Sequence, residues 1–146
     1  MKSTWIYIAA VAAAALLAIL AFVFMPVAAP PKPELDQSRS QSSAKGLFVA
    51  EIQPENAEIK QGRLHSWVIT VKTPDGKPVE DAKISAGGVM PDHNHGLPTS
   101  PQVTQHLGQG RYRIEVVNFS MSGWWELRFD ISSAAGNDTV VFNLVL

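Results

Sequence analysis

The sequence predicts an all-β domain, an antiparallel β-sandwich, preceded by one N-terminal transmembrane helix. Seven short segments between residues 46 and 146 alternate apolar and polar side chains with the period of two of a half-buried strand. Turn signals such as Pro74-Asp-Gly76 separate them, and no segment keeps a helical period over ten residues. Seven strands in about 100 residues are typical of an immunoglobulin-like sandwich. An eight-stranded barrel is the main alternative.

The first 25 residues predict a membrane anchor. Residues 5–25 contain no charged side chain, and as a helix these 21 residues would span about 31 Å, the thickness of a bilayer's hydrocarbon core. Lys2 precedes the apolar run and no basic residue follows until Lys32, which places the N-terminus in the cytoplasm. The expected location is therefore the bacterial inner membrane, with a single pass and a periplasmic C-terminal domain. A cleaved signal peptide is the alternative, although Pro30 would hinder cleavage and the run is long for a signal.

Residues 26–45 are expected to be a linker. Four prolines between residues 26 and 33 are followed by a serine-rich polar stretch. Such a composition buries too little apolar surface to offset the entropy lost on ordering. We therefore expect a tether, and a folded domain over residues 46–146.

The predicted strands follow in order along this domain. Trp67, Ile69 and Val71 share one face of the second strand, and Tyr112, Ile114 and Val116 are expected to share one face of the fifth. The seven predicted strands are Leu47–Ile52, Trp67–Val71, Ala82–Gly88, Val103–Leu107, Tyr112–Val116, Trp125–Ile131 and Val140–Leu146.

A proline-rich loop, Met90–Pro101, interrupts this pattern and is longer than the usual connection of about 2–6 residues. If successive strands run antiparallel, this loop, the turn at residues 54–62 and the corner at residues 118–123 share one end of the sandwich. Because the first predicted strand would start at the tether, that end is expected to point away from the membrane.

The shared end gathers candidate metal ligands: His93, His95, Met90 and Met121. Imidazole suits several transition metals and thioether selects the soft Cu(I) ion, so the set predicts a copper site. Packing roles for the two methionines stay open as alternatives. Met90 continues an inward-facing row and can be the last core residue of its strand, and Met121 can close the end of the sandwich. His65 lies in phase with Trp67 and is expected to be a half-buried core histidine.

Two further side chains are placed by the same alternation. His106 lies beside the turn Gly108-Gln-Gly110, at the opposite end, and is expected to be solvated. Trp124 falls on the outer face of its strand, where it can mark a partner surface or pack under the tether.

Composition excludes several function classes. Twelve basic against thirteen acidic residues give a net charge of −1, which provides no electrostatic basis for binding nucleic acid. The chain has no cysteine, which excludes disulfides, thiolate metal sites and cysteine nucleophiles. The sequence contains neither a Gly-x-Ser-x-Gly motif nor paired carboxylates in a loop, so we expect the protein not to be an enzyme.

Three motifs resemble the YtkA-like domain family: Met90-Pro-Asp-His-Asn-His-Gly-Leu-Pro-Thr, Gly110-Arg-Tyr112 and Phe119-Ser-Met-Ser-Gly-Trp-Trp-Glu-Leu127. The single anchor with an outward β-domain is also similar to FixH-type proteins. The resemblance covers residues 46–146. It implies an immunoglobulin-like sandwich, frequently encoded beside copper handling or cytochrome oxidase assembly functions.

Two positions depart from the family pattern. The family often has Gly between the two histidines and Pro after the position of Met121, whereas Asn94 and Ser122 stand here. Neither change removes a candidate ligand. The sequence thus predicts a membrane-anchored accessory protein that binds or passes on copper, with a protein partner in oxidase assembly or copper homeostasis. The alternative is a metal-free interaction module of a membrane complex, docking through the loop and Trp124.

Overall fold

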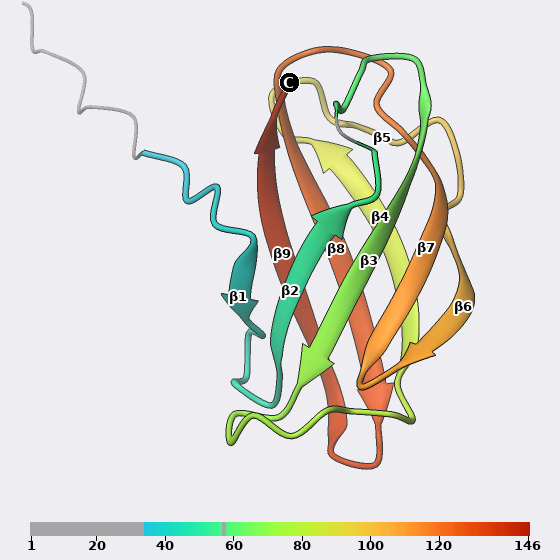
Figure 1. Cartoon of the computed structure of the whole chain (residues 1–146). Coiled ribbons are helices and arrows are strands. Elements are labelled where there is room, and N and C mark those ends of the chain that lie inside the picture. The colour runs from blue at the N-terminus through green and yellow to red at the C-terminus, as the bar shows by residue number, and fades with distance from the viewer. Residues whose placement is uncertain (1–33, 57) are drawn as a thin grey trace, which may run out of the picture. The chain divides into compact units, whose positions relative to one another are not determined.

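The computed structural model describes residues 34–56 and 58–146, which form two antiparallel β-sheets packed face to face (Figure 1). The first sheet has the order β1-β2-β3-β7-β6 and the second β5-β4-β8-β9. The described residues form β1 Ser40–Ser42, β2 Val49–Pro54, β3 Leu64–Lys72, β4 Lys83–Met90, β5 His95–Gly96, β6 Gln102–Gly108, β7 Arg111–Asn118, β8 Trp124–Ser133 and β9 Gly136–Val145. These residues contain no helix. The predicted all-β, antiparallel, two-sheet fold is confirmed.

The predicted membrane span at residues 5–25 lies outside the described residues. Within the described part of the chain, no helix is long and apolar enough to cross a bilayer.

All seven predicted strands are present, as β2, β3, β4 and β6 to β9. Their alternation sends one face of each sheet into a common core, where burying a large apolar side chain stabilises the fold by about 1.5–3 kcal/mol. Trp67 and Trp125, one from each sheet, are 1% and 0% exposed. Around them pack the other large buried side chains, Phe48, Phe119, Phe142, Ile52, Ile69, Met90, Ile114, Ile131, Val71 and Val140.

The expected face of Val116 is wrong. Tyr112 and Ile114 are buried as predicted, but Val116 is 39% exposed and Val117 takes the buried position. The cause is a bulge: Val116 has a φ of 67°, and the pairing with β3 shifts between His65 and Trp67. A bulge inserts one extra residue and reverses the alternation after it.

The folded domain begins earlier than residue 46. Within the expected linker, Ser40–Ser42 forms β1 and pairs antiparallel with β2. Arg39 accepts a backbone hydrogen bond from Ile52 (2.9 Å), and its guanidinium lies 5.2 Å from the centre of the Trp67 ring. These contacts make the end of the expected linker part of the sheet.

This extra strand removes the basis for the expected membrane-distal position of the loops. That expectation required β2 to be the first strand, starting at the tether. Because β1 precedes β2 and runs antiparallel to it, the chain enters the domain in the opposite direction (Figure 1).

The expectation that three connections share one end of the sandwich is confirmed. The β2–β3 connection, the β4–β6 connection and the β7–β8 connection lie at the upper end in Figure 1. Gln61 Nε2 donates to the Ser120 carbonyl (2.9 Å), and the Gly62 amide donates to the Phe119 carbonyl (2.8 Å). The turns between β6 and β7 and between β8 and β9 lie at the opposite end (Figure 1).

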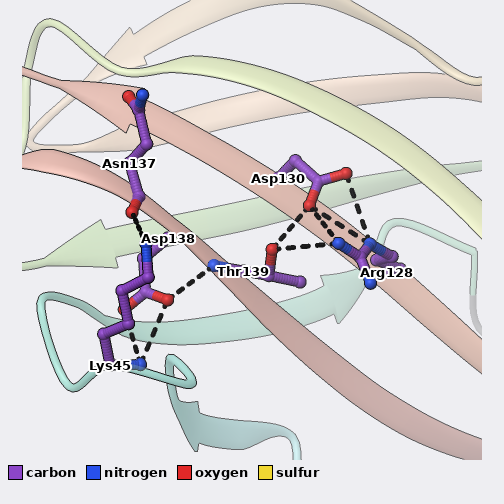
Figure 2. A network of polar contacts seen from close by, with 6 residues as sticks. All are labelled: Lys45, Arg128, Asp130, Asn137, Asp138 and Thr139. Atoms are coloured by element: carbon purple, nitrogen blue, oxygen red, sulfur yellow. Dashed lines mark hydrogen bonds and ion pairs between the residues drawn. The ribbon is translucent and has the colours of Figure 1, made fainter.

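At that opposite end, Asp138 fastens the turn between β1 and β2 to β9 (Figure 2). Its carboxylate accepts hydrogen bonds from the backbone amides of Lys45 (3.0 Å), Leu47 (3.2 Å) and Thr139 (2.8 Å). Burial acts to raise the pKa of Asp138, but these amides and the nearby Ser43 hydroxyl outweigh it and lower the pKa from 3.8 to about 2. The sequence prediction does not include Asp138; its signal is a charged residue in phase with the inward-facing Val140.

We expect Asp138→Asn to lower the melting temperature at pH 7 and the loss to shrink on acidification. A carboxyl whose pKa is lower in the folded than in the unfolded state stabilises the fold above about pH 4. That stabilisation is lost as the pH falls toward 2, so the parent and variant melting curves should converge. The measurement is thermal unfolding by circular dichroism between pH 7 and pH 2. Glu51→Gln, which removes an exposed carboxylate, controls for net charge, and a pH-independent difference for Asp138→Asn would contradict the assignment.

Candidate functional site

The loop after β4 turns back immediately rather than remaining irregular. The amides of His93 and Asn94 both donate to the Met90 carbonyl, at 3.1 and 2.9 Å. Asn94 has a φ of 51°, a conformation that glycine adopts freely and asparagine tolerates better than most residues. The turn therefore accommodates Asn at a position where the resemblance implies Gly. The turn leads into β5, where His95 pairs with Met90.

The rest of this loop is fastened to both sheets. The Leu97 amide donates to the Gly88 carbonyl (3.1 Å). Thr99 Oγ1 donates to the Val116 carbonyl (2.6 Å), at the bulge in β7. The bulge therefore gives the loop an attachment point on the first sheet, while β4 holds it on the second.

A second loop carries Met121 to the same place. The Trp125 indole N–H donates to the Met121 carbonyl (3.0 Å). Gly123 exchanges backbone hydrogen bonds with Leu146, at 2.9 and 3.1 Å. The conformation of this loop requires glycine, because the φ of Gly123 is 121°.

The two loops bring three of the four predicted ligands together. His95 Nε2 lies 3.3 Å from Met121 Sδ, and the ring centres of His93 and His95 are 6.0 Å apart. His93 is exposed, His95 is half-buried and Met121 is 39% exposed. The His95 ring also contacts the buried Trp125 ring, with centres 5.7 Å apart at 71°. The cluster is accessible from solvent and rests on the core.

Met90 is placed differently. Its side chain is 2% exposed and belongs to the hydrophobic core. A Cβ built on Gly123 would lie 2.6 Å from Met90 Cε, so the methyl group fills the space beneath the Met121 loop. Met90 thus lies directly under the cluster and packs as a core residue.

The other two histidines lie outside this cluster. His65 is 4% exposed, its Nε2 lies 2.9 Å from the Lys60 carbonyl oxygen, and its ring is 6.1 Å from that of Phe119. It is more deeply buried than the half-buried core histidine expected. His106 is exposed as expected, beside the β6–β7 turn. Its Nε2 lies 2.8 Å from Glu80 Oε2, and its ring stacks on the Tyr112 ring with centres 4.6 Å apart.

Trp124 is half-buried on the outer face of β8. Its indole N–H donates to Asn143 Oδ1 (2.9 Å), and Asn143 Nδ2 donates to the Asp36 carbonyl (3.0 Å). Asn143 therefore connects Trp124 to the segment that enters the domain, which agrees with packing under the tether.

Both ring nitrogens of His95 face an acceptor. Nδ1 lies 3.3 Å from the Gly96 carbonyl oxygen and Nε2 lies 3.3 Å from the Met121 sulfur. A neutral imidazole carries one N–H, so it can satisfy only one of these two contacts. A cation bonded to Nε2 and sulfur would leave the proton on Nδ1, pointing at the carbonyl. Metal-bound histidines commonly donate their second N–H in this way.

Among the described residues, no three His, Cys, Asp or Glu side chains are grouped so that they can hold a metal ion. A metal at this cluster would therefore depend on the thioether as well as the imidazoles. Imidazole and thioether together favour copper over the hard cations Mg²⁺ and Ca²⁺, which take oxygen ligands.

Comparisons with known proteins identify one domain family. A family model described as YtkA-like matches residues 40–130. No curated protein matches the chain. Among solved structures, the chain is similar to one titled ZirS C-terminal Domain, with 12% identity, a TM-score of 0.38, and coverage of 86% of this chain and 90% of that one.

Proposed function

This chain belongs to the YtkA-like family, and we propose that it is a membrane-anchored extracytoplasmic accessory protein that binds or passes on copper. The observation that carries the proposal is the 3.3 Å contact between His95 Nε2 and Met121 Sδ, with His93 beside it. In this proposal His93, His95 and Met121 hold the ion. Met90, the fourth predicted ligand, packs in the core and is not a ligand in this proposal.

The atoms present fit a copper ion. Zinc, a neighbouring divalent metal, forms bonds of about 2.0 Å to imidazole nitrogen and about 2.3 Å to thiolate sulfur, which sum to about 4.3 Å and serve as a guide for copper. Two such atoms 3.3 Å apart are close enough for one ion to bond to both. The second imidazole, that of His93, is on an exposed turn, and the centre of its ring lies 6.0 Å from that of His95. The thioether favours Cu(I), and the imidazoles accept either oxidation state of copper. When bound, the metal would be a copper ion that the protein can pass on.

The exposure of the cluster agrees with a transfer role. His93 and Met121 both meet solvent, so a partner protein can reach the ion without unfolding the domain. We propose that such a partner acts in cytochrome oxidase assembly or copper homeostasis. Nothing in the cluster provides a nucleophile with an adjacent base, and we propose a non-enzymatic role.

Strand order supports the immunoglobulin-like type of sandwich. Antibody constant domains pair strands A, B, E and D in one sheet and C, F and G in the other. Naming β2, β3, β4, β6, β7, β8 and β9 as A to G reproduces both sheets of that arrangement. The anchor proposed for residues 5–25 rests on their uninterrupted apolar sequence, with Lys2 on the cytoplasmic side.

Copper titration of the purified full-length chain tests the proposal. We expect the parent to bind one Cu(I) ion. A His93→Ala/His95→Ala double variant should bind at least about tenfold more weakly, because losing a residue that only supports a metal ligand already weakens metal binding about tenfold or more, and these residues are the ligands themselves. His106→Ala is the matched control, since it removes a solvent-exposed histidine at the opposite end. It should bind copper like the parent. Equal, weak binding by the parent and the double variant would show that the proposal is wrong.

A further inference from the structure

Trp125 contacts both loops of the proposed copper site, and we infer that it is the positioning residue that keeps His95 and Met121 together. The inference rests on the proposed function. Trp125 is not itself a ligand, because its indole N–H is engaged with a backbone carbonyl and its ring is fully buried.

Two different contacts tie Trp125 to the two ligands. Its N–H donates to the Met121 carbonyl at 3.0 Å, which holds the backbone of the loop that carries the thioether. Its ring meets the His95 ring nearly at a right angle, with centres 5.7 Å apart. One side chain thus sets both the position of the sulfur and the orientation of the imidazole.

Trp125 is itself held by the core. It lies in β8, paired with Leu144 of β9, and its ring packs edge-to-face on Phe119 with centres 5.5 Å apart. Its exposed fraction is 0%. Ligands on loops keep a productive geometry when the residues behind them are locked by packing and hydrogen bonds. The indole thus connects two partly exposed loops to the rigid sheet.

A substitution at Trp67 provides a matched control for one at Trp125. Trp67 is also a core indole, 1% exposed, but its Nε1 has no hydrogen-bond partner among the described residues. Trp125→Phe and Trp67→Phe remove the same atoms from equally buried positions. Only the first also releases the Met121 carbonyl and changes the ring that faces His95.

The test measures Cu(I) affinity and thermal stability of the full-length parent and both variants. We expect Trp125→Phe to weaken Cu(I) binding about tenfold or more, as loss of a supporting contact typically does, while Trp67→Phe binds like the parent. A second readout is tryptophan emission, because copper on His95 should quench Trp125. The copper-dependent quenching should shrink in Trp125→Phe, in which Trp124 remains as a neighbouring emitter, and persist in Trp67→Phe.

If Trp125→Phe does not fold, benzothienylalanine at position 125 replaces the N–H by sulfur and keeps the two-ring shape. Weakened copper binding by this analogue supports the inference. Parent-like binding by the analogue, or equal affinities for the two Phe variants, overturns the inference and leaves the copper proposal standing. Absence of copper binding by the parent overturns both.

Discussion

Gly110→Ala should destabilise the domain by roughly 2–6 kcal/mol, the sum of a left-handed backbone strain of about 1–3 and an overpacking cost of about 1–3. The φ of Gly110 is 69°. A Cβ there would collide with the Val71 carbonyl oxygen and lie 3.0 Å from the Val79 amide nitrogen. Both neighbours are backbone atoms joined by a hydrogen bond to each other (3.0 Å), so neither can rotate away. Because small domains are stable by only about 5–15 kcal/mol, a large part of the stability would be lost.

Gly108→Ala in the same turn is the control for this prediction. Gly108 also has a positive φ, 77°, but a Cβ there meets nothing within 4 Å. Only the conformational strain remains, about 1–3 kcal/mol. Urea unfolding of the parent and both variants provides the measurement. Equal midpoints for the two variants would contradict the steric contact at Gly110.

Met121→Leu should weaken Cu(I) binding about 10-fold or more, the loss that even a supporting contact to a metal ligand produces. Leucine keeps the apolar volume but has no sulfur to bond a soft ion. Met121 is 39% exposed, so the folded state should change little in stability. The measurement is competition for Cu(I) against a chelator of known affinity, together with thermal unfolding. Unchanged Cu(I) affinity would remove the thioether from the site.

Met90→Leu is the matched comparison and, unlike Met121→Leu, should not weaken copper binding. Met90 is 2% exposed in the core, and a volume-conserving swap there usually costs less than about 1.5 kcal/mol. Copper affinity should stay at the parent value, because His93, His95 and Met121 remain. A loss of copper binding equal to that of Met121→Leu would show that Met90 is a ligand, as the sequence alone allowed.

The alternation of side chains predicted most of the fold because it is a local property of strands. In β8, Trp125, Leu127 and Phe129 alternate with polar residues and are all buried. The alternation does not hold at Val116, where a bulge reverses the faces. Alternation does not predict β1 either, because Ser40–Ser42 has the composition of a linker and becomes a strand only by pairing with β2.

The candidate site, like the fold, could be predicted from the sequence only in part. Counting antiparallel strands was enough to place the loops carrying His93, His95 and Met121 at one end, since this needs only the order of strands. The burial of Met90 was one of two open readings, because a residue at the end of a strand can face the core or the loop. The packing of Gly123 over its methyl group decides between them.

The sequence by itself determined the all-β class, the inward faces of most strands and the end at which the histidines and methionines gather. These follow from the period of two and from strand order, which are written in neighbouring residues. Only the tertiary structure decided which side chains meet. His95 and Met121 are 26 residues apart in the chain and come within 3.3 Å because Asn94 reverses one loop and Trp125 holds the other. Such contacts depend on turn conformation and on packing between distant segments, which no local pattern encodes.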